Sequence, residues 1–103
     1  MGEPQLQKEQ SLRFAAPNVY HRMVESFKKL NIHPYDVQGT IMAAKDGFDI
    51  TIRSVATASE ITKISISKEQ AKNPDEKVDR LFEEAAEKCK SQLITDYFKM
   101  IKL

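Results

Sequence analysis

The dipeptide Asp46-Gly47, which lies between two stretches of alternating apolar and polar residues, constrains this chain more than any other feature. It favours a two-residue type I′ turn, in which both central positions adopt positive φ. Because a one-residue slip would mix the two faces, turn and pattern together predict an antiparallel hairpin over residues 37–56. Its apolar face pairs Lys45 with Phe48, Ala43 with Ile50, Ile41 with Ile52, Gly39 with Ser54 and Val37 with Ala56.

Residues 61–67 alternate in the same way and predict a third strand, with the even-numbered residues on one side. A short connection after the hairpin places Ile64 opposite Ile52 and Ile66 opposite Ile50. All these isoleucines then share the apolar face. The sequence therefore predicts a three-stranded antiparallel meander.

A first helix is predicted over residues 17–30, before the strands. Pro17 fits a first helical position, and Asn31 tolerates the left-handed region that often ends a helix. Apolar residues recur at spacings of three and four, which is typical of an amphipathic helix: Tyr20, Met23, Phe27 and Leu30.

A second helix is predicted from residue 74 to near the end of the chain. Asn73 is its expected N-cap, with Pro74 at the first helical position and Glu76 completing a capping box. One apolar stripe runs along it: Val78, Leu81, Phe82, Ala85, Cys89 and Leu93.

These elements predict a two-layer α+β fold of order α-β-β-β-α, in which two helices cover one face of the meander. Ser67 and Gln70 add a capping box that opens a helical turn over residues 68–72. The chain of 103 residues is expected to form a single domain over residues 15–103, preceded by a flexible N-terminal arm over residues 1–14. A frayed helix is the alternative for this arm, and its Leu12 and Phe14 are candidates to dock on the domain.

Composition excludes several function classes. The formal net charge is only +1, so no overall field attracts a polyanion. A single cysteine, Cys89, forms no intrachain disulfide, and with His21 and His33 it makes no recognisable metal-ligand spacing. No catalytic motif is present, and no apolar run approaches the roughly 20 residues of a membrane span. We therefore expect a soluble cytoplasmic protein that is not an enzyme and needs no metal or cofactor.

The end of the chain predicts an interaction surface. A helix from residue 74 onward is longer than an eight-residue strand, so its last turns extend beyond the sheet. These turns carry apolar side chains in several directions, which a small monomer cannot cover. We expect a protein-interaction module, self-associating as a homodimer or binding another protein, through Ile94, Tyr97, Phe98 and Ile101.

An alternative function is binding of double-stranded RNA. The element order is that of the double-stranded RNA-binding domain, and Ser67-Lys68-Glu69-Gln70-Ala71-Lys72 is similar to the lysine-rich start of that family's last helix. The resemblance implies lysines on phosphates across the major groove. Glu69 stands where the family usually has lysine, and Asn73-Pro74 interrupts a helix that the family continues. The predicted nucleic-acid patch is Arg53, Lys63, Lys68 and Lys72.

Overall fold

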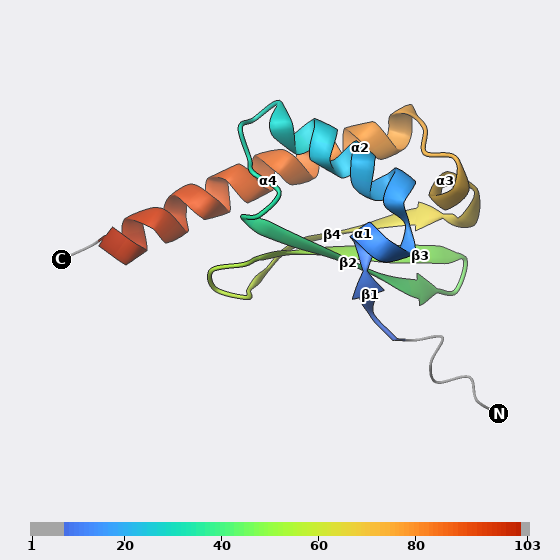
Figure 1. Ribbon diagram of the computed structural model, residues 1–103, viewed down its shortest axis with the longest axis horizontal. Coiled ribbons are helices and arrows are strands. Elements are labelled where there is room, and N and C mark those ends of the chain that lie inside the picture. Colours follow the sequence, from blue (N-terminus) through green and yellow to red (C-terminus); the bar gives the residue numbers. More distant parts are fainter. Residues whose placement is uncertain (1–7, 102–103) are drawn as a thin grey trace.

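The computed structural model describes residues 8–101, apart from the side chains of residues 96 and 98–101. The predicted α+β fold is confirmed: helices cover one face of an antiparallel sheet of order β1-β2-β3-β4 (Figure 1). The elements in chain order are β1 (Gln10–Ser11), α1 (Leu12–Ala15), α2 (Pro17–Lys28), β2 (Val37–Ala44), β3 (Gly47–Ser54), β4 (Glu60–Ser67), α3 (Lys68–Lys72) and α4 (Glu76–Ile101).

The predicted register of the hairpin is wrong by two residues. Ile41 lies opposite Ile50 instead of Ile52, and Ala44 lies opposite Gly47, so Lys45 and Asp46 form the turn. The next strand shows the same shift, with Ile50 opposite Ile64. A shift of two residues preserves the alternation of the side chains, which is why the apolar face is still the one predicted.

Gly47 explains the error. Its φ lies outside the left-handed region, so it is not the second position of a type I′ turn. A Cβ on Gly47 would instead lie 2.1 Å from the backbone oxygen of Ile66. The glycine is needed because β3 and β4 approach closely at this point, a tertiary contact that a two-residue turn signal does not encode.

The expected flexible arm, residues 1–14, differs from the structure in its described part. β1 pairs with β2, and Leu12 is completely buried at the start of α1. Gly39 makes room for it, since a Cβ there would lie 3.3 Å from both Leu12 Cδ2 and Met23 Sδ. Residues 1–7 lie outside the described residues.

The core lies between the sheet and the pair α2 and α4. α2 ends near the predicted residue, and Asn31 adopts the expected left-handed conformation with φ 62°. Burial of these apolar side chains is the main stabilising contribution, at roughly 25 cal/mol per Å². The largest buried hydrophobic residues are Phe27, Phe82, Leu12, Met23, Ile50 and Ile52.

The connection between α3 and α4 is partly as predicted. Ser67 and Gln70 form the expected capping box at the start of α3, in which Gln70 N donates to Ser67 Oγ at 3.1 Å and Ser67 N donates to Gln70 Oε1 at 2.9 Å. The predicted N-cap Asn73 is wrong: α4 begins at Glu76, and the carboxylate of Asp75 accepts a hydrogen bond from Val78 N at 3.2 Å. Pro74 and Asn73 serve as the connection instead of the first turn.

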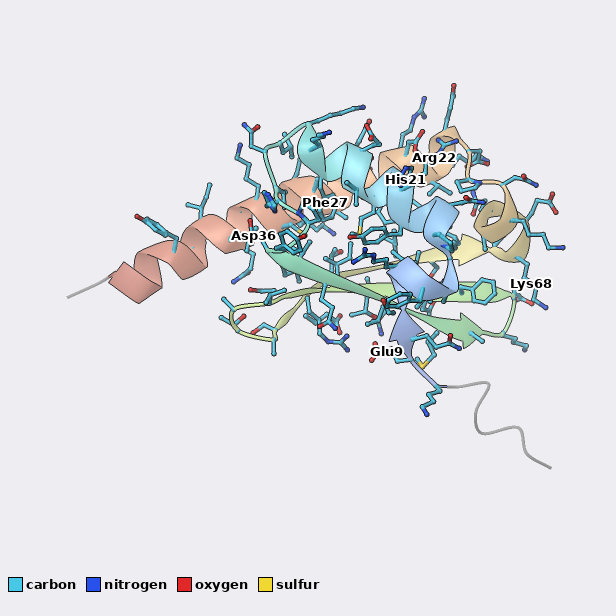
Figure 2. The ribbon with its side chains drawn as sticks, in the orientation of Figure 1. Glu9, His21, Arg22, Phe27, Asp36 and Lys68 are labelled. Carbon is cyan, nitrogen blue, oxygen red and sulfur yellow. The ribbon has the colours of Figure 1, made fainter. Side chains whose placement is uncertain are left out.

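Arg22 on α2 holds this connection in place. Its guanidinium donates to the Asp79 carboxylate at 2.6 Å and to the Pro74 carbonyl at 2.9 Å. Figure 2 shows Arg22 on the side of α2 that faces the start of α4. One side chain therefore links α2, the α3–α4 connection and the first turn of α4.

Candidate functional site

The C-terminal end of α4 extends past the sheet. The helix has 26 residues, so it is about 39 Å long, whereas an eight-residue strand spans about 27 Å. In Figure 1 its last turns run beyond the β3–β4 connection, with no strand beneath them. The helix is buried against the core as far as Cys89, and Leu93 is half-buried.

A groove lies beside this end of α4, where the connection from α2 to β2 approaches the helix. We call it the C-terminal groove; its volume is about 390 Å³, and it is lined by Leu30, Asn31, Ile32, Asp36, Lys90, Leu93, Ile94 and Tyr97. Ile94 is 48% exposed and Tyr97 is 59% exposed. Two of the four predicted interaction residues therefore border a single apolar depression. Large apolar side chains gathered at one place on a surface are typical of interaction sites.

The groove also carries one charge of each sign. Asp36 lies on its loop side and Lys90 on its helix side, and both are exposed. Within the described residues neither takes part in an ion pair. Figure 2 places Asp36 at the end of the loop nearest the extending half of α4.

Phe98 and Ile101 are the other two predicted interaction residues. Their backbone belongs to α4, but their side chains lie outside the described residues. Their part in the predicted surface stays a prediction.

The predicted nucleic-acid patch is divided between the two sides of the sheet. Arg53 and Lys63 alternate with inward-facing residues of β3 and β4 and lie on the face opposite the helices. Lys68 and Lys72 lie on α3, at the end of the helix layer. Figure 2 shows Lys68 at this end of the molecule. The structure brings two of these residues together in each place, but it does not unite all four.

Arg53 is already engaged by an anion. Glu9 accepts hydrogen bonds from Thr40 Oγ1 at 2.7 Å and from Arg53 Nη1 at 3.1 Å. The hydrogen bond from Thr40, opposed by partial desolvation and assisted by Arg53, lowers the pKa of Glu9. The carboxylate therefore stays ionised and offsets the charge of Arg53.

The three candidate metal ligands, His21, His33 and Cys89, lie in different surroundings. His21 is exposed on α2, and His33 stacks on Tyr35 with ring centroids 5.2 Å apart. Cys89 is fully buried, and burial raises the pKa of its thiol to about 11. In the described part of the chain, no three His, Cys, Asp or Glu side chains group to hold a metal ion.

A larger hollow, which the sequence did not indicate, lies at the opposite end of the helix layer. We call it the lysine cleft; its volume is about 650 Å³. It was missed because its walls come from segments far apart in the chain, and only the fold brings them together. It is lined by Lys8, Gln10, Ala15, Ala16, Pro17, Asn18, Ile41, Ala43, Phe48, Lys68, Ala71 and Lys72.

Comparisons with protein-family models, curated proteins and solved structures give no significant match to this chain. The resemblance to double-stranded RNA-binding domains therefore rests on element order and one six-residue segment. Over residues 8–101, no helix has both the length and the apolar character that crossing a bilayer requires.

Proposed function

We propose that this chain is a non-enzymatic interaction module of the cytoplasm that forms a homodimer through the C-terminal groove and the end of α4. The observation that carries the proposal is the exposure of Ile94 and Tyr97 beside a groove lined by Leu30, Ile32 and Leu93. Covering these side chains removes apolar surface from water, which drives association.

A second copy is the occupant that we assign to the groove, because the groove carries one charge of each sign beside its apolar residues. A twofold interface brings the same patch of each copy together, so each contact between two different residues occurs twice. The groove supplies apolar residues for the centre of such an interface, and Asp36 and Lys90 supply opposite charges at its sides. Two copies related by a twofold axis can pair Asp36 of each with Lys90 of the other.

Size-exclusion chromatography with light scattering at micromolar concentrations tests the dimer. The unchanged chain is expected to elute with twice the monomer mass, and the double variant Ile94→Asp, Tyr97→Asp as a monomer. Phe14→Asp is the matched control, because Phe14 is 82% exposed on α1 and does not line the groove. A monomeric unchanged chain, or loss of the dimer in the control as well, would contradict the proposal.

A charge exchange tests which surface is used. Asp36→Lys and Lys90→Asp each place like charges opposite one another, so each single variant is expected to weaken the dimer. The combined variant restores opposite charges and is expected to restore the dimer. A combined variant weaker than both single variants would show that these residues do not meet across the interface.

The alternative function, binding of double-stranded RNA, is tested by a separate titration. We expect double-stranded RNA at low salt to cause no salt-sensitive shift, because Arg53 is paired with Glu9 and Lys63 lies on the other face from Lys68 and Lys72. A saturable shift that weakens as salt is added would favour the nucleic-acid function.

A further inference from the structure

We propose that the lysine cleft binds a small molecule that carries an anionic group on an apolar body. This site is separate from the proposed dimer surface, since the two hollows share no lining residue. The cleft lies where β1, the first turn of α2, the β2–β3 hairpin and α3 meet.

The floor of the cleft accounts for the apolar body. Ile41, Ala43 and Phe48 face it from the sheet, and Ala15 and Ala71 face it from α1 and α3. The alanines leave the space that larger side chains would fill. A volume of about 650 Å³ lies within the roughly 300–1,000 Å³ of pockets that take whole small molecules.

The rim of the cleft accounts for the anionic group. Lys8, Lys68 and Lys72 are exposed there, and none of the residues that line the described cleft is acidic. In the described part of the chain, none of the three lysines is held in an ion pair. Three cations that converge on one hollow without a carboxylate create a local positive potential, although the whole chain is nearly neutral.

The start of α2 adds a further preference for an anion. Ala16 caps this helix without a side-chain hydrogen bond, Pro17 follows, and the first turn contains no acidic residue. The early N–H groups of a helix lack partners within the helix, and the helix dipole makes this end positive. Because Ala16, Pro17 and Asn18 line the cleft, this positive end borders the same space as the lysines.

Neither half of the site is sufficient by itself. Exposed lysines interact weakly with a free anion in water, because solvent and salt screen the charge. A shallow apolar floor likewise holds a neutral ring weakly. The ligand class that fits must therefore bring both parts in one molecule, and binding is expected to need both.

Titrations of ¹⁵N-labelled full-length chain followed by NMR test this requirement. The probe is 1-naphthyl phosphate, and its matched controls are 1-naphthol, which lacks the anion, and inorganic phosphate, which lacks the ring. We expect saturable shifts for the probe in the amide signals of Ala15, Ala16, Asn18, Phe48 and residues 68–72, with each control at least tenfold weaker. Equal affinity for the probe and either control would overturn the proposal, as would shifts located elsewhere.

Two variants separate the charged and apolar contributions. Lys68→Gln with Lys72→Gln is expected to weaken the probe at least fivefold, whereas Lys77→Gln with Lys88→Gln, on exposed positions of α4, removes the same charge and is expected to change affinity less than twofold. Ala43→Leu fills the floor and is expected to weaken the probe at least fivefold while the ¹⁵N spectrum outside the cleft stays unchanged. An equal loss in both lysine pairs, or unchanged affinity in Ala43→Leu, would overturn the proposal.

Discussion

The two halves of α4 belong to one continuous helix but meet different surroundings. The first half packs on β4 and α2, and Val78, Phe82, Ala86 and Cys89 are fully buried there. The second half has no strand beneath it, and Ile94 and Tyr97 remain about half exposed. The difference teaches that sheet length, not helix propensity, sets how much of this helix the fold requires. The remainder keeps apolar side chains that stay largely exposed to solvent.

The largest expected effect is a loss of stability from the buried half. Phe82→Ala removes a completely buried ring and leaves a cavity, so we expect the free energy of unfolding to fall by about 3–5 kcal/mol. Urea unfolding followed by circular dichroism measures this change. A loss below about 1 kcal/mol would mean that the first half of α4 is not tightly packed against the core.

Cys89 gives the next largest effect and adds a pH dependence. Burial raises the pKa of its thiol from 9.0 to about 11, so the unfolded chain loses this proton at a lower pH than the folded chain. The corresponding stability is fully present below pH 9 and is lost as pH rises through about 11. We expect the difference in free energy of unfolding between the unchanged chain and Cys89→Ala to fall by on the order of 2 kcal/mol between pH 9 and pH 11. A gap that stays constant in urea unfolding at both ends of the range would contradict the buried thiol.

The cap of α4 separates the predicted start of the helix from the observed one. Asp75→Ala removes the carboxylate that accepts from Val78 N, and is expected to lower the free energy of unfolding by about 1 kcal/mol. Asn73→Ala is the matched control, with an expected change within about 0.5 kcal/mol. A larger loss of stability in Asn73→Ala than in Asp75→Ala, measured by thermal or urea unfolding, would show that Asn73 is the N-cap.

The smallest effect is expected from the second half. Ile94→Ala changes a side chain that is 48% exposed, so the free energy of unfolding should change by less than about 0.5 kcal/mol when measured at a concentration too low for association. The same variant at high concentration should lower the dimer fraction. A large loss at low concentration would show that a single subunit already covers Ile94.

The sequence predicted the fold well where several local signals agreed. Alternation over the three strands, the apolar spacing of α2 and the Ser67–Gln70 capping box each matched the observed element. The register failed because Gly47 serves a close contact with β4, while its local sequence is typical of a turn. Docking of Leu12 on the domain was a possibility raised by its apolar character, but its complete burial could not be predicted, because the space for it is created by Gly39, on a distant strand.

The candidate sites were predictable to a smaller degree. The apolar excess near the end of α4 pointed to Ile94 and Tyr97, but the loop that completes the groove, with Ile32 and Asp36, could be placed only by the fold. The lysine cleft gave no local signal, because Lys8 and Lys68 are 60 positions apart in the chain. Surfaces built from distant segments depend on tertiary geometry, which periodicity does not encode.

The hydrogen bonds of Arg22 have a consequence for ligand binding in the nearby lysine cleft. By bonding to the Pro74 carbonyl and to Asp79, this side chain restrains the movement of α2 relative to the segment that follows α3, and both helices line the lysine cleft. We therefore expect the cleft to be preformed, so that little conformational entropy is lost when the proposed ligand binds. The affinity of a ligand for the cleft should then depend on how well its shape fits the cleft, and little on any conformational change in the protein.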